Sequence, residues 1–165
     1  MKSICVIDSK DYNDNDPKIE RLAARAIIYK DNLLAMITSL KYKEYKFPGG
    51  GINVGEDNIT ALIREVKEET GLIVIPSSIK EYGSIREIRK SIFEKDQIFD
   101  MTSFYYTCEV EDEVGETNLD PYEIELGYKL EYILPTQALD KNKEANISWS
   151  KRENIILELL IKGEN

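Results

Sequence analysis

Acidic residues at helical spacing are the feature of this chain that could do chemistry. Between Gly50 and Leu72, four glutamates and one arginine fall at fixed intervals: Glu56, Arg64, Glu65, Glu68 and Glu69. A helix over residues 58–70 would bring Glu65, Glu68 and Glu69 to one face, because residues three and four apart on a helix are neighbours. Like charges placed in this way destabilise a helix by roughly 0.2–0.5 kcal/mol per pair. A hard divalent cation would offset that repulsion, so the pattern indicates a carboxylate metal site.

The expected helix also has an apolar side and recognisable ends. Its apolar residues recur at i, i+3, i+4 and i+7: Ile59, Leu62, Ile63 and Val66. This spacing predicts a stripe packed on a core, with the carboxylates facing away from it. Asp57 is placed to cap the start of the helix, and Gly71 stands where a left-handed residue commonly ends one.

Arg64 and the glycines before the helix are the next candidates. Arg64 lies four residues before Glu68, so we expect its guanidinium to hold and orient that carboxylate. Residues 47–51 contain Pro48 followed by three glycines, which allow close approaches that a Cβ would forbid. Carbonyl groups of such a loop could ligate a cation, and its amides could contact anionic oxygens.

Each of these features has an ordinary explanation when it stands alone. A charged helix face is usually solvated surface, and glycines after a proline are usually a turn. With each specified residue type near roughly 5–7% of average composition, seven matches coincide by chance on the order of once in 10⁹ start positions. The joint pattern therefore favours a functional site.

The segment 50–72 resembles the signature box of the Nudix hydrolases, without a departure at the specified positions. The resemblance implies an α/β fold, specifically an α/β/α sandwich with a mixed β-sheet and a loop-helix-loop catalytic motif. It also implies Mg²⁺-dependent hydrolysis of a nucleoside diphosphate linked to another moiety, by attack of water on phosphorus. The products would be a nucleoside monophosphate and the phosphorylated other half, or pyrophosphate from a triphosphate.

The resemblance also implies roles for individual residues. The family's principal metal-binding and catalytic acids correspond to Glu65, Glu68 and Glu69. Glu56 matches the first glutamate of the box, which joins the metal site in some members and is structural in others. Gly50 matches the glycine whose carbonyl often joins the coordination sphere, and Arg64 matches the structural arginine that we group with the catalytic acids.

Two features outside the strict pattern bear on substrate and mechanism. Asn53 stands where many relatives carry a glutamate, a departure that concerns substrate contacts. Many relatives also use a further acid from a downstream loop as general base or extra ligand, and no motif fixes its position. The candidates in this chain are Glu111, Glu113, Glu123 and Glu125, each of which could equally be an ordinary solvated acid.

Composition excludes several other classes of protein. The 165 residues fit one domain, 1–165. A net charge of −9 weighs against nucleic-acid binding. No run has the apolar length of a membrane span, and no signal-peptide core follows Met1, so we expect a cytoplasmic protein away from the membrane. Cys5 and Cys108 are expected to be reduced thiols without a catalytic role.

The chain contains no histidine. The commonest general base, the Ser-His triad and the usual transition-metal sites are therefore excluded. Carboxylates must do the acid-base work, and an oxygen-only ligand set favours Mg²⁺, with Mn²⁺ as a substitute, over zinc.

Periodicity predicts the elements that position the box. A short opening strand precedes a polar loop at 11–17, and residues 22–29 and 33–38 are expected to form a hairpin that turns at 30–32. Further strands are expected at 45–47, 72–75, 79–86, 102–110 and 128–133. Pro135 opens a helical turn that ends at Leu139. Ser148 is expected to cap a final helix over 149–161, which Gly163 ends.

Substrate contacts must lie outside the box. Six aromatic residues could stack on a base, although strand aromatics are more often core: Tyr42, Tyr45, Phe47, Tyr82, Phe104 and Tyr105. We single out Phe47 and Tyr105 as substrate-binding candidates. Arg86 is the third, because with Arg89 and Lys90 it forms the main basic cluster and could meet a distal phosphate.

Several alternatives stay open at this point. The substrate could be ADP-ribose or another nucleotide sugar, or a normal or oxidised nucleoside triphosphate. Some relatives are non-catalytic nucleotide-sensing modules with a damaged box, but here the acids are intact and little length remains for a partner domain. An isoprenoid diphosphate isomerase shares the fold, and the absence of histidine weighs against it. The expected partner is a small nucleotide, and the protein could be a monomer or a homodimer.

Overall fold

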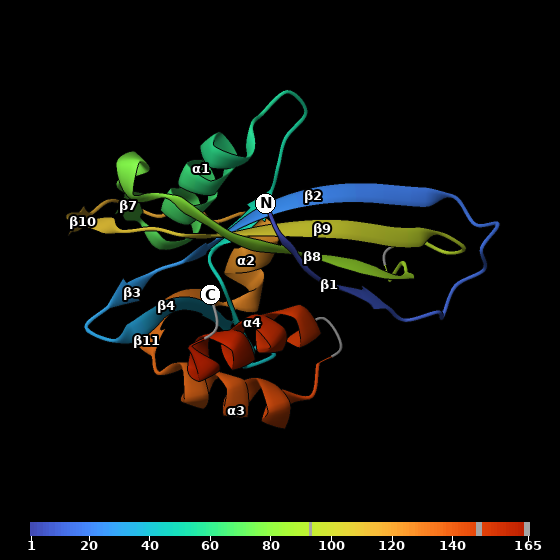
Figure 1. Ribbon diagram of the computed structural model, residues 1–165. Coiled ribbons are helices and arrows are strands. Elements are labelled where there is room, and N and C mark those ends of the chain that lie inside the picture. The colour runs from blue at the N-terminus through green and yellow to red at the C-terminus, as the bar shows by residue number, and fades with distance from the viewer. Residues whose placement is uncertain (93, 148–149, 164–165) are drawn as a thin grey trace.

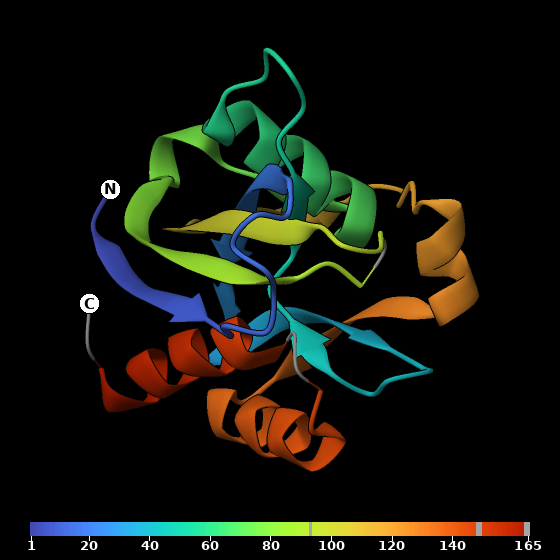
Figure 2. The same ribbon diagram turned by 90° about the vertical axis from the view of Figure 1, so that its right-hand side faces the viewer.

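A computed structural model describes residues 1–92, 94–147 and 150–163. Sheets lie between helix α1 (Asn58–Thr70) on one side and helices α3 (Pro135–Ala145) and α4 (Lys151–Lys162) on the other (Figure 1). Figure 2 shows the same layers from the side, with the short helix α2 (Pro121–Leu126) at the edge of the sheets. The expected α/β/α sandwich is therefore confirmed.

The main sheet is mixed. Its five strands run in the order β1 (Ser3–Asp8), β8 (Lys80–Lys90), β9 (Ile98–Thr107), β2 (Lys18–Ile27) and β6 (Gly49–Gly51). β1 is parallel to β8 and β2 is parallel to β9, whereas β8 with β9 and β2 with β6 are antiparallel. The glycine strand β6 is thus an edge strand, which leaves its outer side open to helix α1.

Two smaller sheets complete the strands. One has the order β11 (Tyr128–Ile133), β4 (Leu33–Ser39) and β3 (Tyr29–Lys30), with β5 (Tyr45–Lys46) also paired to β4. The other pairs β10 (Val110–Val114) with β7 (Leu72–Val74), and a 3₁₀ turn follows at Pro76–Ser78.

Two cores hold the layers together. Beneath α1, Leu62 and Val66 pack with Ala24, Ala26 and other apolar residues of the sheets. On the opposite face, α3 and α4 cover a second core, whose members are Ile27, Leu34, Met36, Tyr45, Phe47, Ile85, Tyr105, Ala138, Leu139, Ile156 and Leu157. Burial of apolar area of this kind, at roughly 25 cal/mol per Å², is the main stabilising contribution. The box helix and helix α4 are therefore fixed to opposite faces of the same strands.

The box helix has the predicted bounds, Asn58–Thr70. Asp57 caps it by accepting bonds from the amides of Ile59 and Thr60, and Gly71 ends it with a left-handed φ of 74°. The predicted apolar stripe is wrong at Ile59, which is 36% exposed. The expectation that all three carboxylates face away from the core is wrong for Glu69, which is only 4% exposed.

The predicted hairpin is confirmed at its turn and wrong in its first strand. Asp31 and Asn32 have φ angles of 50° and 64°, the positive values that tight hairpin turns require. Across this turn, β4 pairs with the two-residue strand β3, whereas β2 starts at Lys18 and pairs with β9 and β6 in the other sheet. The chain changes sheets between Ile27 and Tyr29, a change that local periodicity does not reveal.

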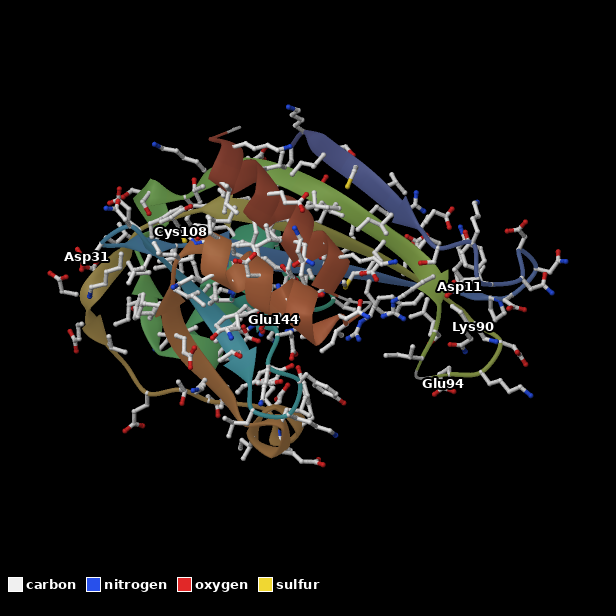
Figure 3. The ribbon with its side chains drawn as sticks, turned by 90° about the horizontal axis from the view of Figure 1, so that it is seen from below. Asp11, Asp31, Lys90, Glu94, Cys108 and Glu144 are labelled. Atoms are coloured by element: carbon white, nitrogen blue, oxygen red, sulfur yellow. The ribbon has the colours of Figure 1, made fainter. Side chains whose placement is uncertain are left out.

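Other predicted bounds also differ. β8 and β9 extend beyond 86 and before 102, into a long arm that ends near Asp11 and Lys90 (Figure 3). β10 and α2 were not predicted, and α3 runs to Ala145 where only a turn was expected. α4 begins at Lys151, and Ser148 and Trp149, where its cap and start were expected, lie outside the described residues. Gly163 ends α4 as predicted.

No helix within the described residues is long and apolar enough to cross a membrane.

Candidate active site

The Arg64 guanidinium hydrogen-bonds to the carboxylates of three glutamates. Its Nε and Nη2 donate to the two carboxylate oxygens of Glu56, each at 2.8 Å. Its Nη1 donates to Glu65 at 2.7 Å and to Glu68 at 3.0 Å, and Nη2 also reaches the Gly51 carbonyl at 3.0 Å. The predicted orientation of Glu68 by Arg64 is present, and the same guanidinium fixes two further carboxylates.

The hydrogen bonds from Arg64 hold Glu56 in its charged form. They are the largest cause of a shift that lowers the pKa of Glu56 to about 2, and the Asn53 amide adds a bond of 2.9 Å. Glu65 behaves in the opposite way, because burial raises its pKa despite its bond to Arg64. Glu56 and Glu65 are therefore electrostatically distinct, although both bond to Arg64.

Gly50 is shaped by Glu65. A Cβ at position 50 would lie 2.3 Å from Glu65 Oε2, so no larger residue fits while that carboxylate stays in place. Gly49 is needed for a different reason: its φ is 134°, and a Cβ would lie 2.1 Å from the Ala24 carbonyl oxygen. The two glycines therefore let the loop lie close to strand β2 and to the Glu65 side chain of helix α1.

Glu69 is buried in a pair with Lys46. Lys46 Nζ lies 2.7 Å from Glu69 Oε1, and the Gly49 amide donates to Oε2 at 2.7 Å. Burial opposes the charge on Lys46, but Glu69 raises the pKa of Lys46 overall, so the ammonium stays charged. The ammonium also lies 4.1 Å from the centre of the Tyr128 ring, a favourable cation–π position.

The segment after β10 brings a further acid close to Glu69. The amides of Gly115 and Asn118 donate to the carbonyls of Gly71 and Glu68, each at 2.8 Å, which ties the segment to the end of α1. Helix α2 follows and carries Glu123, whose carboxylate accepts bonds from the Tyr122 hydroxyl at 3.0 Å and the Asp120 amide at 2.9 Å. Burial raises the pKa of Glu123, and the charge of Glu69 raises it further.

These side chains line one cleft of about 560 Å³. Its lining residues are Arg21, Leu22, Ala23, Arg25, Lys46, Gly49, Gly50, Gly51, Asn53, Arg64, Glu65, Glu68, Glu69, Met101, Asn118, Asp120, Tyr122 and Glu123. Both cations and carboxylates line it, a combination suited to an anionic ligand together with a metal ion.

The comparison with protein families decides the identity. The family model of the NUDIX domain matches residues 20–152, most of the chain and the whole of this cleft. The chain belongs to the Nudix family. As a Nudix hydrolase it is in the class of pyrophosphohydrolases that act on small nucleotide substrates.

Solved structures agree on the fold. A NUDIX hydrolase from Nitrosomonas europaea has a TM-score of 0.62 at 17% identity, covering 85% of this chain and 88% of that chain. A MutT protein from Bacillus halodurans has a TM-score of 0.56 at 16% identity, with 84% and 80% covered. The E. coli ORF135 protein has a TM-score of 0.53 at 16% identity, with 87% and 89% covered. The search of curated proteins found no match.

Nudix hydrolases generally use divalent metal ions, and the donor chemistry here fits one. The carboxylates and the Gly50 backbone offer only oxygen, as Mg²⁺ and Mn²⁺ prefer. Because Gly50 has no Cβ, its backbone can lie directly against the carboxylate of Glu65. In the part of the chain that the structure describes, no three acids already form a ligand cluster, because Arg64 holds Glu65 and Glu68 while Lys46 holds Glu69.

None of the three predicted substrate-binding residues lines the Nudix cleft. Phe47 and Tyr105 are both 0% exposed and pack edge to face in the core, with ring centres 5.8 Å apart. They cannot stack on a base, because other side chains cover both rings. Arg86 lies on the long arm outside the cleft, where it pairs with Asp100 through two bonds of 2.7 and 2.6 Å.

Among the four downstream acids, only Glu123 reaches the cleft. Glu111 and Glu113 are exposed on β10, and Glu125 is exposed on α2. Three of the cations that line the cleft were not predicted: Arg21, Arg25 and Lys46. A charged residue inside an otherwise apolar strand, as at Arg25, was the available sequence signal.

Proposed function

We propose that this Nudix hydrolase cleaves the phosphoanhydride bond of a nucleoside diphosphate linked to another moiety, with water attacking one phosphorus. The observation that carries the proposal is that Glu65, Glu68, Glu69 and Glu123 line the same cleft as Lys46 and Arg64. Acids alone would repel a diphosphate, and cations alone would bind it without activating water. A cleft with both kinds of group is suited to hydrolysis.

Glu65, Glu68, Glu69 and the Gly50 carbonyl would hold Mg²⁺, with Mn²⁺ as a substitute. A bound cation supplies charge neutralisation on the phosphoryl oxygens and a lowered pKa for water. The role of Arg64 is to keep Glu65 and Glu68 in place, since one Nη1 donates to both. Glu56 supports Arg64 from its far side through two parallel bonds and is a structural partner in this assignment.

Glu123 is the best-placed proton acceptor. A general base works best when its pKa is near the operating pH, and burial moves the pKa of Glu123 upward, toward that range. Its two bonds, from Tyr122 and Asp120, fix the direction of the carboxylate. Glu123 would therefore take the proton of the attacking water, while the box acids bind and orient.

The cations favour a substrate with several phosphates. Lys46 is paired with Glu69, and Arg64 with three glutamates. In the described residues, the Arg21 side chain has no ion pair, although it lines the cleft beside Gly51. Arg21 is free to meet a distal phosphate, so a nucleoside triphosphate is favoured over ADP-ribose or another nucleotide sugar.

We place the activity in a single domain, 1–165, acting in the cytoplasm as a monomer or homodimer. No nucleic acid or membrane partner is proposed, and the net charge of −9 supports the first of these exclusions.

A substrate panel tests this function. Nucleoside triphosphates, nucleotide sugars and dinucleoside polyphosphates would each be incubated with Mg²⁺ and with chelator, and released nucleotide and phosphate measured. Metal-dependent cleavage of triphosphates is expected. Binding without turnover across the panel would contradict the proposal in favour of a nucleotide-sensing module, and cleavage that chelator does not affect would contradict the metal assignment.

A further inference from the structure

Arg25 connects the glycine loop to the interior of the protein. It lies on β2 opposite Gly49 and is only 7% exposed. Its Nη1 donates to the carbonyl oxygens of Phe47 at 3.1 Å and Gly49 at 3.2 Å. These two carbonyls flank Pro48, so one guanidinium holds both ends of the turn that leads into β6.

Glu153 of helix α4 is the carboxylate partner of Arg25. It is 2% exposed, and its Oε1 lies 3.9 Å from Arg25 Nε and 3.1 Å from Arg152 Nε. Arg25 Nε is buried without a hydrogen bond in the described residues. A buried guanidinium needs a nearby negative charge to offset its lost hydration, and Glu153 supplies that charge from the opposite layer of the sandwich.

The loop that Arg25 holds sets the positions of two catalytic acids. The Gly49 amide donates to Glu69, and the next residue, Gly50, lies against the carboxylate of Glu65. Gly49 has no space to shift toward β2, because the Ala24 carbonyl already fills the place of a Cβ. A change in the loop at Phe47 or Gly49 would therefore move the surroundings of both acids at once.

We propose that Arg25 and Glu153 are a positioning pair, through which the packing of helix α4 fixes the glycine loop and so the two acids beside it. The proposal rests on the proposed function for its kinetic consequence and on the geometry alone for its structural one. Glu153 does not line the cleft, so its effect on catalysis passes through its neighbours, of which Arg25 is the one that bonds to the loop.

The test compares three variants that disturb the same buried cluster. Arg25→Lys removes the guanidinium whose Nη1 donates to both carbonyls, and Glu153→Gln removes the charge while keeping the shape. Arg152→Lys is the matched control, because Arg152 is a buried arginine that also contacts Glu153 but bonds to Glu87 and Met101 Sδ and to no atom of the loop. The measurements are kcat, KM, melting temperature and the hydrogen-exchange rate of the Gly49 amide.

Arg25→Lys and Glu153→Gln should each lower kcat by roughly ten- to hundredfold, as small misplacements do, with KM nearly unchanged. The Gly49 amide should exchange faster in both variants. Arg152→Lys should lose thermal stability to a similar degree while kcat and the Gly49 exchange rate stay at the wild-type values.

Two results would overturn the proposal that Arg25 and Glu153 position the loop. One is unchanged kcat and Gly49 exchange in Glu153→Gln, which remains informative if Arg25→Lys fails to fold. The other is an equal effect in Arg152→Lys, which would reduce the role to general stability. If the wild type hydrolyses nothing, the proposed function fails, whereas the exchange rates still decide on the pair because they need no substrate.

Discussion

The carboxylate of Glu65 lies against the α-carbon of Gly50, so closely that a Cβ there would be 2.3 Å from Oε2. Gly50→Ala should therefore displace Glu65 and lower kcat by about a hundredfold or more, with the protein still folded. Gly51→Ala is the control, because the nearest atom to its Cβ would be 4.0 Å away. Steady-state kinetics and circular dichroism of both variants would check this, and equal activity in the two would contradict the assigned contact.

Arg64 should not tolerate lysine. A lysine cannot reproduce the two parallel bonds to Glu56 and the shared bond to Glu65 and Glu68. We expect Arg64→Lys to lower kcat and Mn²⁺ affinity by roughly ten- to hundredfold, the usual cost of removing a group that orients metal ligands. Isothermal titration with Mn²⁺ and activity assays would measure both.

Arg86→Lys provides the comparison for Arg64, since Arg86 also makes a forked pair with a carboxylate but lies outside the cleft. That variant should keep wild-type activity and metal affinity. A similar loss in both variants would show that forked arginine pairs matter only for stability here.

Glu123 and Glu125 lie on the same short helix, and only Glu123 lines the cleft. Glu123→Gln should lower kcat by about a hundredfold or more, within the usual contribution of a general base. It should also remove the ionisation of this group from the pH profile of kcat. Glu125→Gln should behave like the wild type. An unchanged pH profile in Glu123→Gln would transfer the role of base to another group.

The ion pair between Arg86 and Asp100 should make the free energy of unfolding depend on pH in the acid range. The Arg86 bonds hold the pKa of Asp100 below its ordinary value of 3.8. The native state then binds fewer protons than the unfolded state, so the stabilisation is complete above pH 3.8 and is lost as pH falls through the native pKa.

Arg86→Gln should therefore reduce the unfolding free energy at neutral pH by at most about 1 kcal/mol, because the arginine is partly exposed. The difference from the wild type should disappear in strong acid. Urea titrations over this pH range would measure it, with Lys30→Gln on the exposed strand β3 as the control for a simple change of charge. A difference that stays constant with pH would contradict the assigned pair.

The sequence predicts an element most accurately where the residues that determine it lie within the element itself. The helix Asn58–Thr70 has its cap, its apolar period and its terminal glycine within its own segment, and its bounds were correct. The arrangement around Arg64 follows from i, i+4 spacing for Glu68, but the bonds to Glu56 depend on how the preceding loop folds back. Local spacing does not contain that information.

The wrong predictions share a physical cause, which is that burial is decided by other segments. Phe47 and Tyr105 were candidates for a base platform, and helices α3 and α4 cover both rings. Glu123 could not be distinguished from three other acids, because the backbone bonds from Gly115 and Asn118 to the end of α1 bring its helix to the cleft. The contact of Arg25 with the glycine loop could not be predicted without the register of β2 with β6, which places Arg25 opposite Gly49.

Glu68 offers the most direct test of the catalytic site. Its side chain is 36% exposed and, within the described residues, accepts one hydrogen bond, from Arg64, so its loss costs little stability. Glu69, although an equally strong candidate from the sequence, is buried against Lys46 and Gly49, and its substitution would also disturb the loop.

The decisive measurement is hydrolysis of a nucleoside triphosphate by wild-type protein and Glu68→Gln, each with Mg²⁺ and with chelator, at matched folded concentration. We expect wild-type turnover that requires Mg²⁺ and falls by orders of magnitude in Glu68→Gln, with an unchanged melting temperature. Equal Mg²⁺-dependent turnover in the two proteins would contradict the assignment of the box acids as the catalytic metal site.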